Sequence, residues 1–135
     1  MKSSHWSVKA IVFFTVLTSA GCQQWGRQRW TRTELYFGLS HHDGSIISDA
    51  DWSRFVDEQV TPRFPDGLTI VAAEGRFREG QRTLAEPSRV VIILHPPSRE
   101  ADDKIDTLAK AYASQFEQES VLRADSESRV SFISR

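Results

Sequence analysis

The chain has 135 residues and a formal net charge of −1 at pH 7; 39% of its residues are hydrophobic and 26% are charged. These fractions are ordinary for a globular protein. The expected domain carries no basic stripe interleaved with aromatic residues, which excludes the usual signature of a nucleic-acid-binding protein. With a single cysteine, the chain can form no internal disulfide.

Residues 1–21 have the order of a secretory signal. Two lysines near the start precede an apolar run over residues 10–17, and small side chains lead into Cys22. The apolar core has about ten residues, whereas a transmembrane helix needs roughly 20, so we do not expect this segment to span a membrane. The segment resembles a bacterial lipoprotein signal, in which the cysteine takes up lipid and becomes the mature N-terminus. Ser19 stands where such signals usually carry leucine, which leaves ordinary secretion as the alternative.

We therefore predict a lipoprotein of the bacterial cell envelope, anchored to the membrane through palmitate-type lipid on Cys22, with its domain outside the cytoplasm. Two or more acyl chains hold a protein stably on a bilayer, because each buried methylene contributes about 0.8 kcal/mol. Removal of residues 1–21 leaves 114 of the 135 residues, enough for one domain and too few for two. Residues 22–31 are expected to be a tether, and a single domain is expected over residues 32–135. The tether is rich in tryptophan and arginine, so it is either a solvated linker or a segment lying on lipid headgroups.

The first half of the domain is predicted as a strand followed by a helix. The strand covers residues 34–39, with Tyr36 on one face. Its opposite face is apolar and consists of Leu35, Phe37 and Leu39. Ser48 then caps a helix that ends within a residue or two of Pro62. The apolar stripe of this helix consists of Trp52, Phe55, Val56 and Val60.

The middle of the domain is predicted as a hairpin. A rigid connector leads into a strand over residues 68–77, and Glu79-Gly80 is the expected turn. The return strand is expected to begin at Pro87, because proline cannot donate a hydrogen bond to a ladder. It contains an unbroken apolar run over residues 90–94.

The last part is predicted as a second helix and a final edge strand. Ser98 is the expected cap, and the apolar stripe of the helix consists of Ile105, Leu108, Ala109, Tyr112 and Phe116. Residues 121–124 and 130–133 are short strand-like pieces on either side of a polar turn. The complete order predicts an α+β, ferredoxin-like βαββαβ fold, a four-stranded antiparallel sheet with two helices on one face.

The run over residues 90–94 predicts that the sheet has a second apolar face. A strand with one open face should alternate, but this run is apolar at every position. If Val90, Ile92 and Leu94 face the helices, Val91 and Ile93 face away on the side of Tyr36. Leaving them in water would forfeit about 1.5–3 kcal/mol each. We expect a cover, which is either a second copy in a homodimer, a small apolar ligand of unknown identity, or the tether together with the hairpin at 76–88.

Few residues are candidates for chemistry. His95 ends the apolar strand, and Tyr36 shares a strand face with Glu34, so His95 and Tyr36 are the catalytic candidates, although purely structural roles explain both. His41 and His42 are neighbours that point apart in an extended loop, and no further ligand at a suitable spacing completes a metal site. We therefore expect no metal and no cofactor.

Four motifs stand out along the domain. They are Glu34-Leu35-Tyr36-Phe37-Gly38, Asp51-Trp52-x-x-Phe55, Val60-Thr61-Pro62-Arg63-Phe64-Pro65-Asp66-Gly67-Leu68-Thr69 and Glu86-Pro87-Ser88. Over residues 32–134 the chain resembles a bacterial family catalogued as domain of unknown function 3574, whose members are often lipoproteins. The family often has tryptophan after the second-strand glycine, where this chain has Arg76 and Phe77. The resemblance implies one envelope domain, and it implies no reaction and no catalytic residue.

The sequence thus favours a non-enzymatic binding or self-associating module. The alternative is a small enzyme resembling the dimeric α/β-barrel oxygenases and isomerases, acting on a small apolar molecule. In that enzyme Tyr36 and His95 would both line one cavity. What lies over the second face of the sheet separates the two hypotheses.

Overall fold

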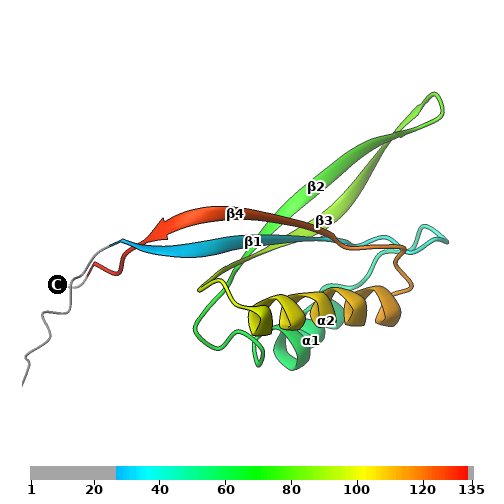
Figure 1. The fold of residues 1–135 in the computed structure, drawn as a ribbon. Helices are drawn as coiled ribbons and strands as arrows, with labels where there is room; N and C mark the ends of the chain where they lie inside the picture. The colour runs from blue at the N-terminus through cyan, green and yellow to red at the C-terminus, as the bar shows by residue number, and fades with distance from the viewer. Residues whose placement is uncertain (1–26, 134–135) are drawn as a thin grey trace, which may run out of the picture.

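The computed structural model describes residues 27–133, which form one antiparallel sheet with helices on one of its faces (Figure 1). The elements are β1 (Gln28–Gly38), α1 (Asp49–Phe55), the π-helix η1 (Val56–Val60), β2 (Thr69–Glu79), β3 (Arg82–His95), α2 (Arg99–Gln115) and β4 (Leu122–Val130). The strand order is β2-β3-β1-β4, so β1 and β3 are central. The predicted ferredoxin-like α+β fold is confirmed.

Both predicted helix caps are formed. The Ser48 hydroxyl accepts a hydrogen bond from the backbone N–H three residues on, and so does the Ser98 hydroxyl, each at 3.1 Å. These bonds satisfy N–H groups that the first turn of a helix leaves without partners. Beyond Phe55 the first helix widens into η1, where Thr61 N–H donates to the carbonyl of Val56 at 2.9 Å. Within residues 27–133, no helix is both long and apolar enough to cross a membrane.

The core lies between the sheet and the two helices. Phe37 of β1 and Val91 of β3 are fully buried there, and Ile93 is 1% exposed. Tyr112 of α2 lies among them, with its ring 4.6 Å from that of Phe37 and its hydroxyl donating to the carbonyl of Gly38 at 2.6 Å. The aromatic cluster around Tyr112 is completed by Trp52, Phe55 and Phe116.

β1 and β4 differ in extent from the predictions. β1 begins at Gln28, so residues 28–31, expected in the tether, pair with β4. β4 is one strand, whereas two pieces separated by a polar turn were expected. Both differences have the same cause. The backbone N–H and C=O groups in the first half of β1 form hydrogen bonds with the polar residues of β4, which are thereby held in one continuous edge strand.

Pro87 lies inside β3 rather than at its beginning. Its carbonyl accepts a hydrogen bond from the N–H of Leu39 at 3.0 Å. The carbonyl and nitrogen of one strand residue point to the same side, so the missing N–H of Pro87 lies on the side away from β2. A proline at this position therefore removes no hydrogen bond from the β2–β3 ladder.

β2 and β3 continue past the end of β1 as a two-stranded extension, called here the hairpin arm (residues 74–87). Within the arm the two strands pair only with each other, since the last partner that β1 gives β3 is Ser88. The turn is formed by Gly80 and Gln81, one residue later than predicted, and Gly80 has a φ of 60° that favours glycine. In Figure 1 the arm extends away from the body of the domain.

Candidate binding face

The sheet face opposite the helices has no covering element within residues 27–133, as Figure 1 shows. Tyr36 lies on this open face, as predicted, and is directly opposite Val90 of β3 and Leu122 of β4. Glu34 is likewise opposite Ile92, so the open face is formed by the even-numbered residues of β3 at this point. We call this surface the open face.

The placement of Val91 and Ile93 on that face was wrong. Both side chains pack under the helices, because Leu35 of the core face is directly opposite Val91. The residues that do lie on the open face of β3 are Val90, Ile92 and Leu94. The expectation that β3 carries apolar groups on both faces holds, but with the two sides exchanged.

The open face is apolar and accessible. Val71 of β2 is 43% exposed, Leu94 of β3 is 40% exposed and Leu122 of β4 is 63% exposed. The same face continues along the hairpin arm, where Phe77 is opposite Leu84 and is 50% exposed. The arm therefore does not fold back over the sheet, which removes the hairpin as a cover for this surface.

A polar ladder runs along β1 through the middle of the open face. The Tyr36 hydroxyl donates to one Glu34 oxygen at 2.5 Å, and Arg32 Nε donates to the other at 2.8 Å. The hydrogen bond from Tyr36, and next that from Arg32, hold the pKa of the Glu34 carboxyl below its ordinary value. The same bond to Glu34 raises the pKa of Tyr36. The ladder thus presents a paired carboxylate and a phenol to whatever covers the face.

His95 lies on the other side of the sheet and does not share a cavity with Tyr36. It is 7% exposed, and Nε2 lies 3.0 Å from the Thr33 hydroxyl while Nδ1 lies 3.0 Å from the carbonyl of Pro96. Thr33 donates its single hydrogen to Asp125 at 2.6 Å, so the ring must donate at Nε2. Both ring nitrogens therefore have a polar partner within hydrogen-bond distance. A buried histidine with both nitrogens engaged is a structural clamp.

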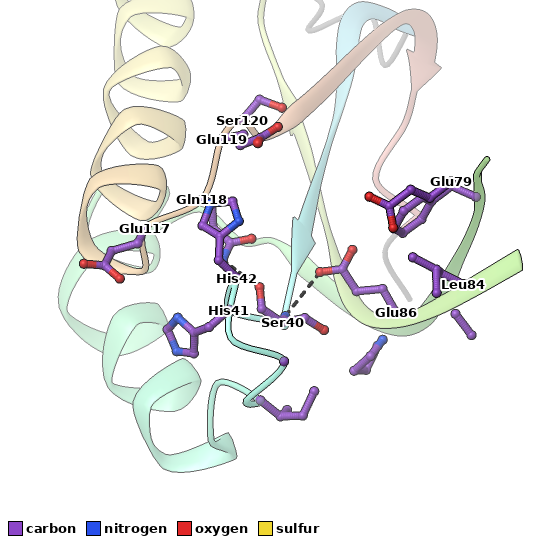
Figure 2. A pocket seen from close by; sticks show the side chains of 15 residues that line it. Ser40, His41, His42, Glu79, Leu84, Glu86, Glu117, Gln118, Glu119 and Ser120 are labelled. Atoms are coloured by element: carbon purple, nitrogen blue, oxygen red, sulfur yellow. Dashed lines mark hydrogen bonds between the residues drawn. The ribbon is translucent and has the colours of Figure 1, made fainter. Parts of the chain in front are cut away.

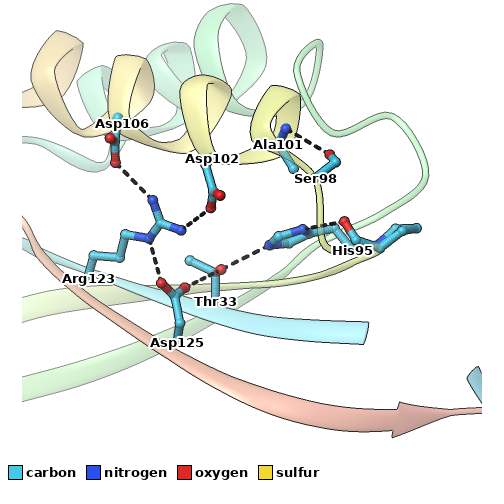
Figure 3. A network of polar contacts seen from close by, with 9 residues as sticks. Thr33, His95, Ser98, Ala101, Asp102, Asp106, Arg123 and Asp125 are labelled. Carbon is cyan, nitrogen blue, oxygen red and sulfur yellow. Dashed lines mark hydrogen bonds and ion pairs between the residues drawn. The ribbon is translucent and has the colours of Figure 1, made fainter. Parts of the chain in front are cut away.

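An acidic cluster extends this clamp to α2, as Figure 3 shows. Arg123 of β4 contacts Asp102 at 2.5 Å, and it contacts Asp106 and Asp125 at 2.9 Å each. One cation therefore contacts three carboxylates, which connects β4 to α2 beside the clamp. Nothing in the sequence signalled this network, because its members come from β1, β3, α2 and β4.

His41 and His42 border a hollow of about 650 Å³ beside the base of the hairpin arm (Figure 2). Its other charged lining residues are Glu79, Glu86, Glu117 and Glu119. Glu86 is engaged, since it accepts a hydrogen bond from the N–H of Ser40 at 3.2 Å. In the described part of the chain, no group of three or more histidine, cysteine or acidic side chains could hold a metal ion.

The fold and the open face define a ferredoxin-like α+β domain with one unpartnered apolar sheet face. By sequence, residues 32–132 match the family described as "Protein of unknown function (DUF3574)", and the chain belongs to that family. No curated protein matches the chain.

Two solved structures share the fold, and a third is less similar. A phage SAM lyase in complex with S-methyl-5'-thioadenosine is 21% identical with a TM-score of 0.59, and the match covers 73% of this chain and 81% of the lyase. The apo state of a phage SAM lyase is 24% identical with a TM-score of 0.57 over the same shares. CutA from Synechococcus elongatus is 10% identical with a TM-score of 0.45, covering 77% of this chain and 83% of CutA.

Proposed function

We propose that this protein is a self-associating module of the bacterial cell envelope, held on a membrane by lipid on Cys22. Copies pack through the open face. The observation that carries the proposal is the row of exposed apolar side chains on that face, which include Val71, Leu94 and Leu122. Leaving them in water forfeits free energy that burial against another apolar face would recover.

The size of the open face suits a protein–protein contact. Four strands about 4.8 Å apart, with about nine residues at 3.3 Å each, give a face of roughly 19 by 30 Å. This area of about 600 Å², enlarged by the arm residues Phe77 and Leu84, approaches the roughly 800 Å² that each partner buries in a stable complex. The face carries a balanced ladder of Arg32 and Glu34, so two copies do not repel each other there.

The hairpin arm favours a second copy as the occupant. An isolated two-stranded hairpin is marginally stable in water, so an arm of this length needs support. Its six residue pairs beyond the sheet span about 20 Å, which matches the width of the open face on another copy. The arm presents Phe77 and Leu84 on the same side as the open face, so apolar side chains would meet apolar side chains.

Sedimentation velocity on the chain from residue 22 onward, with Cys22→Ser, tests self-association. We expect a concentration-dependent oligomer that Leu122→Lys converts to monomer, because an exposed lysine on the face would lose its water in the contact. Thr107→Lys is the control, since Thr107 is exposed on α2, on the other side of the sheet, and its substitution should leave the oligomer intact. A parent protein that stays monomeric at high micromolar concentration would refute the proposal.

Membrane anchoring is tested separately on the full-length protein in bacteria. Cys22→Ser should move the protein from the membrane pellet to the soluble fraction, because the acylated thiol is lost. Ser19→Leu, which supplies the usual leucine, is the control and should leave the protein in the pellet. Unchanged retention of the Cys22→Ser protein would contradict the lipid anchor.

A second candidate is an enzyme acting on a small molecule held over the open face. The paired Tyr36 hydroxyl and Glu34 carboxylate favour it, because they place a donor and an acceptor on an apolar floor. The fold shared with a phage SAM lyase suggests the first substrate to try. The bond between sulfur and the amino-acid part of S-adenosylmethionine would then break, and chromatography should show S-methyl-5'-thioadenosine together with the released four-carbon amino-acid product. The parent protein should form both, and Glu34→Gln much less. No product from the parent would exclude this reaction.

A further inference from the structure

The paired ends of β1 and β4 form an exposed corner with two chemically different sides. On the side of the open face, the Trp30 ring packs edge-on against Phe132 with centroids 5.9 Å apart. Phe132 is 70% exposed and Ile133 is 94% exposed. Aromatic and branched apolar side chains left this accessible at a chain end mark a contact surface.

The other side of the corner is cationic. Arg29 and Arg129 are directly opposite each other in the β1–β4 ladder, an arrangement of like charges that destabilises a strand pair. Glu127 offers one carboxylate to Arg29 at 3.3 Å, where both side chains are at least 66% exposed. Arg27, which directly precedes β1, is exposed and adds a further positive charge at this end of the strand. The corner thus has three guanidinium groups and one carboxylate, and this excess of positive charge would attract an anionic partner.

We infer that this corner, formed by Trp30, Phe132 and Ile133 with Arg27, Arg29 and Arg129, binds the surface of an anionic lipid bilayer. Aromatic rings occupy the headgroup level, and arginines attract lipid phosphates across a short distance. The inference deepens the membrane-anchored part of the proposed function. Five peptide units separate Cys22 from Arg27, and these reach at most about 18 Å, so an anchored molecule carries this corner near the bilayer.

Binding of the chain from residue 22 onward, carrying Cys22→Ser, to vesicles tests this inference without any acyl chain. This chain contains every residue of the core, and it lacks the thiol, so a failure of lipidation cannot affect the result. We expect co-sedimentation with vesicles of phosphatidylglycerol and phosphatidylcholine, and little with phosphatidylcholine alone. No sedimentation with the anionic vesicles at millimolar lipid would overturn the inference.

Paired variants locate the contact. Arg29→Gln with Arg129→Gln should weaken binding about thirtyfold, because each arginine near the surface contributes about 1 kcal/mol, or roughly fivefold. Arg76→Gln with Arg78→Gln removes the same charge from the hairpin arm and should change binding little. Equal losses in the two double variants would show unspecific attraction and overturn the assignment of the corner. Phe132→Ser should also weaken binding, and an unchanged affinity in that variant would equally count against the corner.

Discussion

Removal of the Tyr112 hydroxyl isolates one polar contact at the edge of an apolar core. The Tyr112 side chain is fully buried, and its hydroxyl donates to the carbonyl of Gly38 at 2.6 Å. In Tyr112→Phe the ring contacts persist, but the carbonyl loses its donor. An unpaired buried acceptor costs about 1–3 kcal/mol, and Gly38 is only partly buried, so we expect the free energy of unfolding to fall by about 1–2 kcal/mol.

Urea unfolding followed by tryptophan fluorescence measures this loss. Trp52 is a suitable probe, since it is 6% exposed and its ring lies 6.0 Å from that of Tyr112. All proteins should be compared at one concentration, because self-association adds to apparent stability. The matched control is Tyr36→Phe, the same deletion on the open face, which should cost less than about 0.5 kcal/mol. A Tyr112→Phe protein as stable as the parent would refute the role assigned to this hydrogen bond.

The difference in stability between the parent and Tyr112→Phe should also depend on pH in alkaline solution. Burial, and next the charge of Glu86, raise the pKa of Tyr112 above its ordinary value. A group whose pKa is raised by folding contributes stability that is fully present below its unfolded pKa, here about 10, and is lost as the pH rises through the folded value. The stability gap between the parent and Tyr112→Phe should therefore narrow above about pH 10.

Three further variants test the polar contacts. Tyr36→Phe removes the hydrogen bond that is the largest cause of the lowered Glu34 pKa, so an NMR titration of the variant should show a higher Glu34 pKa. Because folding lowers this pKa, the bond stabilises the protein above about pH 4.5, and its contribution is lost as the pH falls. An unchanged Glu34 titration curve would mean that Tyr36 and Glu34 form no hydrogen bond. Thr33→Val keeps the shape of the side chain but removes the hydroxyl that both His95 and Asp125 contact. The free energy of unfolding measured in urea should therefore fall by about 1–3 kcal/mol. A variant as stable as the parent would contradict the clamp. Gly38→Ala brings a Cβ within 2.6 Å of a Glu86 oxygen, so we expect the free energy of unfolding to fall by less than about 1 kcal/mol. This loss of stability should disappear when Glu86→Ala is also present. A loss that persists in the double variant would mean that the backbone at Gly38 causes it.

Local rules predicted most of the fold. The caps at Ser48 and Ser98 depend on groups three residues apart, and the helical stripes depend on spacing within one element. The strand order followed from the number and order of elements and the handedness of crossovers. What failed was the extent of β4, whose polar residues were predicted as a turn. Their pairing depends on β1, about a hundred positions earlier in the chain.

The open face was predicted from one strand and misjudged on another. In β1 the alternation of polar and apolar residues assigns Tyr36 to one side without further information. In β3 every position from 90 to 94 is apolar, so the sequence does not show which of these residues face the helices. Only the pairing of Leu35 with Val91 decides which of them enter the core. The His95 clamp depends on a partner 62 positions away, and no local pattern reveals such a bond.

Pro87 also affects whether another strand can add to the hairpin arm. Where β1 ends, the arm presents an unprotected strand border of the kind that templates unlimited strand addition. Pro87 offers no donor where this border begins, and its carbonyl already accepts from Leu39, so a further chain could use only the short stretch of β3 beyond it. Addition of strands along the β3 backbone is thereby disfavoured.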